Sequence, residues 1–479
     1  MEGFYEEGRL RELTGLEEQY ESSKFEFAVI YGRRRVGKTS IISEFIGRGD
    51  KKAIRYIATE SADAVNREDF SKKVFSVYPE YSSLKIFPAW ETAFDYIAKQ
   101  AKGERLILVI DEYPYIAKEY PPISSELQRI IDTVLKDTKI MLVLCGSSMS
   151  FMEKQVLAYQ SPLYGRRTSQ YLIKALDYYS SAEFFGNAGY EDKLLAYAVT
   201  GGIPLYLSLI SDAETVAEGI DRQFFSAKGF LYEEPKNLLK QELREPALYN
   251  GIITAIAGGA TKLNEIAGRV KELDSTVAKD IKNLIELDIV KKKASMFADT
   301  ERAGRYSIKD GMYRFWHRFI PRSLDLIADG RKNIFRDTDP SMISDFMGHA
   351  FEDICEQYLR RMNVRDRLPF LFNKIGKWWG GDPRTKEETE IDIIAVNDNK
   401  AILGECKWTN KKAGTEVYQR IKEKTAAVPQ LIDRDVYYYL FSRSGFTETL
   451  RREAEGDGKL KLVNLNDLFD PSISVHSII

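Results

Sequence analysis

The sequence predicts an α/β protein of several domains, with a parallel sheet in its N-terminal half and a second α/β unit at its C-terminus. Three observations lead to this fold class. Apolar runs alternate with amphipathic stretches over residues 25–148, as βαβ units do. Helical spacing of apolar residues then dominates over residues 170–287. Finally, 479 residues exceed what one hydrophobic core usually supports, so three or four domains are expected.

Continuous apolar runs are expected to form the N-terminal sheet, because strands buried on both faces of a parallel sheet lack a polar side. The expected strands are residues 25–31, 53–58, 106–110 and 140–145. Residues 170–245 read as helices, interrupted by the Thr-Gly-Gly-Ile-Pro segment at 200–204.

Residues 32–39, GRRRVGKT, match the phosphate-binding pattern G-x4-G-K-[ST] in full. Gly32 and Gly37 let backbone N–H groups turn toward a phosphate, Lys38 reaches the β and γ oxygens, and Thr39 offers its hydroxyl to Mg²⁺. Ser40 follows in the same helix as a further binding residue. A chance glycine turn is the alternative, but a preceding strand and a following helix supply the context the motif requires. ATP and Mg²⁺ are therefore the expected cofactors.

Two acids end the apolar run at 106–110, which predicts the second half of the ATP site. Asp111 would bind Mg²⁺, and Glu112 would act as general base on the attacking water. Ser147 ends another apolar run and could sense the γ-phosphate, although small polar residues after a strand are also ordinary turn residues. Arg166 and Arg167 could neutralise charge on the transferred phosphoryl group, or be surface arginines.

Residues 246–312 follow the order of a winged helix, with three helices and then two short strands around 289–293 and 305–308. Polar residues of the third helix could face a DNA groove, and the wing lysines could bind phosphates; these residues are Thr276, Lys279, Lys282, Asn283, Lys291, Lys292 and Lys293. Acidic neighbours dilute this signal, so the sequence leaves open whether the module binds DNA or only packs. Residues 313–345 are expected to form a linker.

An acidic and basic pattern marks two apolar strands of the last segment. Asp392 lies within one strand, and Glu405 ends the next, with Lys407 on the same face because side chains alternate. Two carboxylates and an ammonium around one point can bind Mg²⁺ and activate water for phosphodiester attack. The alternative is an ordinary charged strand surface. Glu390, on the Asp392 face, is expected to form a salt bridge instead of binding metal.

The order of motifs resembles the archaeal-type ATPases of the STAND branch of AAA-related NTPases. The resemblance rests on RLREL near the start, GRRRVGKT, LILVIDEYPYI, CGSSMSFM, PLYGRRT and TGGIPLYL. It implies a P-loop NTPase sheet with a helical lid, and it places Pro204 beside adenine. It also implies an appended winged helix and the C-terminal domain DUF234, itself similar to PD-(D/E)XK nucleases of the restriction-endonuclease-like fold. In that comparison the helical Glu352 becomes a further metal ligand.

The expected domains are a P-loop ATPase domain at 1–170, a helical lid at 171–245, a winged helix at 246–312, a linker at 313–345 and a nuclease-like α/β domain at 346–479. Isolated cysteines and only three histidines argue against disulfide or zinc sites. The charged N-terminus and the lack of long apolar runs indicate a cytoplasmic chain that crosses no membrane.

Two functions of different class follow from the sequence. One is an ATPase whose nucleotide state gates a DNA nuclease, and the other is an ATP-driven switch whose C-terminal domain is a scaffold. A net charge of −2 excludes a generic polyanion binder, but local basic clusters could hold DNA. Those near the C-terminal site are Arg360, Arg361, Lys374, Lys377, Lys411 and Lys412, although long charged residues on a solvated face would look the same. A second copy of the chain and another protein are also candidate partners.

Overall fold

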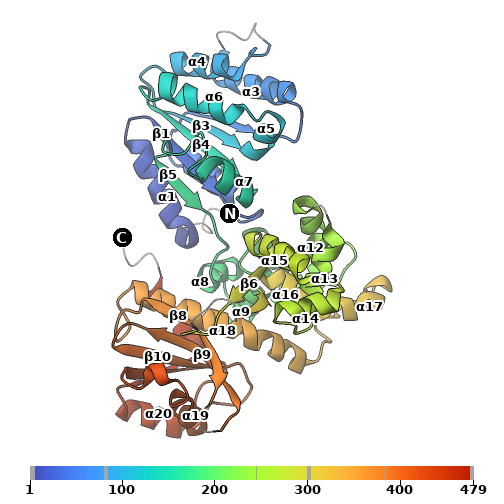
Figure 1. The fold of residues 1–479 in the computed structure, drawn as a ribbon, viewed down its shortest axis with the longest axis vertical. Coiled ribbons are helices and arrows are strands. Elements are labelled where there is room, and N and C mark those ends of the chain that lie inside the picture. Colours follow the sequence, from blue (N-terminus) through green and yellow to red (C-terminus); the bar gives the residue numbers. More distant parts are fainter. Residues whose placement is uncertain (1–5, 80–84, 244, 299–303, 383–384, 475–479) are drawn as a thin grey trace. The chain divides into compact units, whose positions relative to one another are not determined.

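The computed structural model describes residues 6–79, 85–243, 245–298, 304–382 and 385–474 (Figure 1). The chain forms two compact units, Met1–Ala175 and Leu176–Ile479. No helix among the described residues is both long and apolar enough to span a bilayer.

The first unit is built on a five-stranded sheet in the order β2-β3-β4-β1-β5, in which every pair is parallel. Its strands are β1 (Glu26–Tyr31), β2 (Ala53–Ile57), β3 (Leu106–Asp111), β4 (Ile140–Gly146) and β5 (Ser169–Leu172). The first four match the predicted runs within one residue at each end. The start of the predicted helical segment was wrong, because residues 169–172 pair with β1 as a strand.

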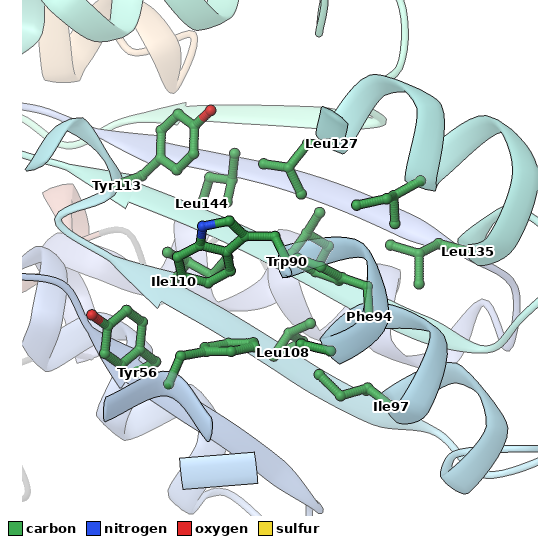
Figure 2. Close-up of a cluster of buried hydrophobic side chains, with 14 of the residues drawn as sticks. Tyr56, Trp90, Phe94, Ile97, Leu108, Ile110, Tyr113, Leu127, Leu135 and Leu144 are labelled. Carbon is green, nitrogen blue, oxygen red and sulfur yellow. The ribbon is translucent and has the colours of Figure 1, made fainter. Parts of the chain in front are cut away.

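The helices of the first unit cover this sheet and bury its apolar strands. They are α1 (Glu6–Glu21), α2 (Lys38–Gly47), α3 (Asp63–Val77), α4 (Trp90–Gln100), α5 (Tyr113–Glu119), α6 (Ile123–Ile130), η2 (Ile131–Leu135), α7 (Met149–Phe151) and η3 (Met152–Leu157). Figure 2 shows the core beneath α4 and α6, where Trp90 and Phe94 contact side chains of β3 such as Leu108. This buried core holds the carboxyl ends of β1, β3 and β4 in fixed positions.

The second unit begins with helices that pack around α16. Its helices up to the C-terminal sheet are α8 (Tyr178–Ser181), η4 (Ala182–Phe185), α9 (Tyr190–Thr200), α10 (Pro204–Ser211), α11 (Val216–Phe224), α12 (Phe230–Glu242), α13 (Pro246–Ala257), α14 (Leu263–Val270), α15 (Asp274–Glu286), α16 (Gly311–Phe319), η6 (Ile320–Arg322), α17 (Leu324–Ala328) and α18 (Pro340–Val364). The antiparallel strands β6 (Val290–Lys293) and β7 (Arg305–Ile308) follow α15, so the element order is the one expected of a winged helix.

Residues 313–345 are not a simple linker, and that prediction was wrong. Most of α16 is buried, and Phe315 contacts Phe224 of α11 with ring centroids 4.8 Å apart. Asp310 caps the helix by accepting the Tyr313 N–H at 2.8 Å. The aromatic residues of α16 therefore form the apolar face of a core helix.

The C-terminal part of the second unit is a mixed sheet in the order β12-β11-β10-β9-β8. Its elements are β8 (Lys374–Gly381), β9 (Glu388–Val396), β10 (Lys400–Lys407), α19 (Thr415–Thr425), η7 (Pro429–Leu431), β11 (Asp435–Ser442), α20 (Glu448–Gly456), β12 (Leu460–Val463), α21 (Leu465–Leu468) and η8 (Pro471–Ile473). The β8–β9 and β9–β10 pairs are antiparallel, whereas the β10–β11 and β11–β12 pairs are parallel. Figure 1 shows α18 on one side of this sheet and α19 and α20 on the other.

The β6–β7 hairpin packs against α18 and β8 and presents little of its charge to solvent. Lys291 Nζ contacts Asp353 Oδ1 of α18 at 2.8 Å, and Lys293 Nζ contacts Glu356 Oε2 at 3.2 Å. After β6, the Met296 N–H donates to the carbonyl of Lys377 at 2.9 Å, so this segment covers the open edge of β8. The three-helix and hairpin segment and the C-terminal sheet are thus joined by ion pairs and backbone bonds.

Candidate nucleotide and carboxylate sites

The phosphate-binding loop between β1 and α2 requires both of its glycines. Gly32 has φ +152°, and a Cβ there would lie 2.2 Å from the carbonyl oxygen of Ile173. Gly37 has φ +91° and ends the loop at the first turn of α2. A side chain at Gly32 would therefore push the loop away from the strand end that positions it.

Lys38 lies inside this loop. Its Nζ donates to the carbonyls of Gly32 and Arg33, each at 2.9 Å, and only 6% of the residue is exposed. Burial lowers the pKa of Lys38, although Glu112 and Asp111 are among the groups that oppose this shift. The ammonium is held where loop N–H groups and the start of α2 would surround a phosphate.

Thr39 and Asp111 lie together at the carboxyl edge of the sheet. The Thr39 hydroxyl donates to Asp111 Oδ2 at 3.0 Å, and Asp111 is only 2% exposed at the end of β3. Arg55 of β2 approaches the same oxygen, with Nη2 3.6 Å from Oδ2. A hydroxyl and a carboxylate in contact are oxygen donors of the kind Mg²⁺ takes, so these residues fit that ion. Ser40 follows Thr39 in α2 and has no described contact with this pair.

Glu112 is held by Ser147. Glu112 has the uncommon backbone angle φ +54°, and its Oε2 accepts the Ser147 N–H at 3.2 Å and the Ser147 hydroxyl at 2.8 Å. The bend after β3 and the end of β4 thus bring the two residues together. Ser147 was predicted as a γ-phosphate sensor; its contact in the structure is with the proposed base.

Arg9 is a buried residue of this region that the sequence argument did not assign. Its Nη2 donates to the carbonyl of Val36 in the loop at 2.8 Å and to the carbonyl of Lys174 at 2.7 Å. Arg9 belongs to the RLREL motif, which served only as part of a family resemblance. Charged residues are frequent throughout α1, so its sequence contains no signal that singles out Arg9.

The two predicted arginines have other partners in the first unit. Arg166 forms an ion pair with Asp132, Nη2 to Oδ2 at 2.8 Å, and Arg167 donates to the carbonyl of Leu157. Both arginines precede the amino end of β5, whereas the loop follows the carboxyl end of the parallel neighbour β1. The structure therefore brings neither arginine to the loop of its own chain. Pro204 starts α10 in the second unit, and its place beside adenine stays a prediction.

The C-terminal carboxylates lie on neighbouring antiparallel strands. The β9–β10 ladder pairs Ile393 with Gly404, so the next position brings Asp392 opposite Glu405. Asp392 Oδ2 accepts the N–H of Cys406 at 2.9 Å, which ties it to β10. The two carboxylates therefore occupy one end of the ladder, with Lys407 two residues further on β10.

Lysines from three elements neutralise these acids. Glu405 accepts from Lys407 Nζ at 2.8 Å and from Lys424 Nζ of α19 at 3.0 Å, one lysine to each carboxylate oxygen. Lys377 of β8 lies 3.0 Å from Glu352, 3.3 Å from Glu390 and 3.9 Å from Asp392. Glu390 thus forms the expected salt bridge. No short motif includes Lys377 or Lys424, which meet the acids only through the fold.

The pKa values of Asp392 and Glu405 are shifted in opposite directions. Burial, Glu405 and Glu352 together raise the pKa of Asp392 to about 7. Burial also acts to raise the pKa of Glu405, but Lys407 and Lys424 outweigh it and leave that pKa below its ordinary value. The pKa of Glu352 is raised, because burial exceeds the effect of Lys377. A bound cation would favour the ionised forms of these carboxyl groups and so lower their pKa values.

The acids have the right chemistry for a hard cation, but their side chains are turned toward lysines. Within the described ranges, no three His, Cys, Asp or Glu side chains are arranged as a metal-binding group. Asp392 and Glu405 remain the pair that one ion could bridge, because they face each other across the ladder. Glu352 is directed to Lys377, so its predicted role as a ligand requires that ion pair to open.

Several basic residues that could hold a DNA backbone have ion-pair partners within the chain. Arg361 is 8% exposed and contacts Asp177 at 2.7 Å, Arg360 pairs with Glu356, and Lys377 pairs with the acids above. Lys374, Lys411 and Lys412 remain exposed on the surface. Arg361 is buried because its face of α18 packs against Asp177 near the start of the second unit, whereas Arg360 stays exposed.

Fewer residues of the predicted DNA-recognition surface on α15 and the wing are available to solvent than the sequence suggested. Lys291 and Lys293 are held by α18, and Asn283 donates to the Tyr249 hydroxyl at 2.7 Å. Lys279 and Lys282 of α15 are exposed. The wing can therefore offer Lys292 to a phosphate, but not the three lysines that the sequence suggested.

Comparison with known proteins is consistent with this geometry. Residues 7–210 match the model of an ATPase domain predominantly from Archaea, and residues 316–419 match DUF234, described as archaeal and bacterial proteins of unknown function. An uncharacterised protein of Methanocaldococcus jannaschii is 33% identical over 464 residues, which are 96% of this chain and 99% of that protein.

Solved structures agree at the level of the fold. A Walker-type ATPase of Pyrococcus abyssi superposes with a TM-score of 0.50 at 20% identity, covering 65% of this chain and 95% of that one. A Signal Transduction ATPase with Numerous Domains from Pyrococcus horikoshii gives a TM-score of 0.29 at 15% identity, covering 75% and 52%, which is too slight to argue from. The full-length relative and the two matched domains show that the chain is an ATPase of the archaeal family that carries a C-terminal DUF234 domain.

Proposed function

We propose that the ATPase site consists of Lys38 on the phosphates, Thr39 and Asp111 on Mg²⁺, and Glu112 as the general base. The observation that carries the proposal is the 3.0 Å contact between the Thr39 hydroxyl and Asp111 beside the loop. Mg²⁺, when bound, would neutralise charge on the β and γ phosphate oxygens. Glu112, which follows Asp111 directly, would accept the proton of the attacking water.

Ser147 contacts the proposed base, Glu112, through two hydrogen bonds. Its N–H and hydroxyl stabilise the Glu112 carboxylate, so the base is held in one orientation at the end of β4. A general base must be within hydrogen-bond reach of its water, either directly or after a small rotation. The Glu112–Ser147 contact would therefore set the resting position of the base.

Two substitutions test the site by separating binding from turnover. Lys38→Ala removes a phosphate contact and should abolish tight ATP binding. Glu112→Gln keeps the Mg²⁺ residues and should bind ATP normally, but turnover should fall by about 10²- to 10⁴-fold. Binding of a fluorescent ATP analogue and phosphate release measure the two effects. Ordinary turnover by the Glu112→Gln protein would remove Glu112 from this role.

We also propose that the Asp392–Glu405–Lys407 group is a Mg²⁺-dependent nuclease site that acts on DNA. The support is the β9–β10 register, which sets the two carboxylates opposite each other with an ammonium on the same strand. Asp392 and Glu405 would hold the cation, whose chemistry is to polarise a phosphodiester and its attacking water. Lys407 would balance charge that develops on the phosphate.

The alternative is a switch in which the same charges serve only as an ion-pair network. It is favoured by the observation that both acids of the group already have a lysine partner, Lys377 for Asp392 and Lys407 and Lys424 for Glu405. Cleavage of supercoiled plasmid by the full-length chain in Mg²⁺ or Mn²⁺ separates the two functions. Asp392→Asn should lose metal binding and cleavage together, whereas Lys407→Gln should bind metal and lose cleavage. Cleavage that survives Asp392→Asn comes from elsewhere, and its absence from the wild type favours the switch.

A further inference from the structure

The helix α19 presents two cations beside the C-terminal carboxylates. Lys424, in its last turn, contacts Glu405 Oε2 at 3.0 Å. Arg420 lies four residues earlier and hence on the same helical face. Arg420 is exposed and has no ion-pair partner among the described residues.

This arrangement holds more positive charge than Glu405 requires. One carboxylate accepts from two ammonium groups, and a third cation is nearby without a carboxylate of its own. A group of cations at a surface creates a positive potential that favours the binding of an anion. A nucleic-acid backbone supplies repeated phosphates to such a surface.

We propose that the Arg420–Lys424 face of α19 is the phosphate-binding edge of the C-terminal site, with Lys424 as the counter-ion of Glu405 until a divalent cation takes that carboxylate. The inference rests on the proposed nuclease site. A cation at Glu405 competes for the oxygen that Lys424 occupies. Lys424 is then released beside Arg420, where both can contact the phosphates that flank the bond to be cleaved. In the metal-free protein, Lys424 thus acts by holding the Glu405 carboxylate.

Metal affinity tests the counter-ion role without depending on catalysis. Mn²⁺ binding to the nucleotide-free full-length chain would be measured by electron paramagnetic resonance, with Asp392→Asn defining the component due to this site. Lys424→Gln should tighten that component roughly tenfold, because a competing and repelling charge is removed. Lys422→Gln is the matched control, since its ammonium lies 3.7 Å from the centre of the Tyr418 ring on the same helix. It should leave the affinity unchanged.

DNA binding tests the phosphate role. With Ca²⁺ present and a cleavage-resistant duplex as probe, Arg420→Gln and Lys424→Gln should each reduce the slope of log affinity against log salt by about 0.9, the value of one phosphate contact. Lys422→Gln should not. An unchanged slope for both variants, or unchanged Mn²⁺ affinity for Lys424→Gln, overturns the inference while an Asp392-dependent site leaves the nuclease proposal standing. A wild type with no Asp392-dependent Mn²⁺ binding overturns both.

Discussion

Replacing Lys291 by Met should destabilise the second unit without changing DNA binding. Lys291 and Asp353 form an ion pair at 2.8 Å between β6 and α18, and Arg314 and Lys293 lie 3.5 and 3.7 Å from the same carboxylate. Breaking a fully buried pair typically costs about 3–5 kcal/mol. Asp353 keeps 28% of its side-chain surface exposed and retains two other cations, so a loss of about 2 kcal/mol is expected here.

Urea unfolding followed by tryptophan fluorescence measures this change, because Trp316, Trp378, Trp379 and Trp408 lie in the second unit and only Trp90 lies in the first. Lys292→Met is the matched control. Lys292 is exposed over the Tyr306 ring, and its loss should change stability by less than about 0.5 kcal/mol. Equal stability of the two variants would refute the buried-pair argument, and a lower salt slope for DNA binding in Lys291→Met would return the wing lysine to the DNA surface.

Two further predictions follow from the core and the loop. Gly32→Ala should abolish ATP binding in a nucleotide-binding assay while the chain stays folded by circular dichroism, because the added Cβ would lie 2.2 Å from the Ile173 carbonyl; normal affinity would mean that the loop can shift freely. Burial lowers the pKa of His317 to about 4, below the 6.5 of an unfolded histidine, so the unfolded chain binds the proton first as pH falls. The contribution of His317 to stability should therefore fall by about 2 kcal/mol, after allowance for partial exposure, as the pH decreases from 6.5 to 4, and His317→Gln should lack this component of the pH profile in urea titrations.

The sequence was sufficient to predict elements whose structure is determined by residues close together in the chain. Continuous apolar runs located β1 to β4, and the glycine spacing located the loop around Lys38, because each depends on neighbours in the chain. β5 was missed, since its residues are half-exposed and polar and show no apolar run. Its pairing depends on β1, which lies 141 residues away at the Thr168–Phe27 contact.

The C-terminal site could be predicted only in part, for a related reason. Alternation along β9 and β10 put Asp392, Glu405 and Lys407 on one face, and the ladder follows that register. Lys377 and Lys424 come from other elements, so no spacing in the sequence links them to these acids. The three consecutive wing lysines look solvated in the sequence, but in the structure Lys291 and Lys293 form ion pairs with Asp353 and Glu356 of α18.

The Arg9 contact gives the phosphate-binding loop a mechanical attachment. One nitrogen of the guanidinium holds the carbonyl of Val36, within the loop, and the carbonyl of Lys174, next to the last residue of the first unit. Ala175 then continues covalently into the second unit. A loop that changes shape around a phosphate must either carry residue 174 with it or break a bond to a buried arginine. A change in the loop on nucleotide binding would thus be transmitted through Arg9 to Lys174, at the start of the covalent connection between the two units.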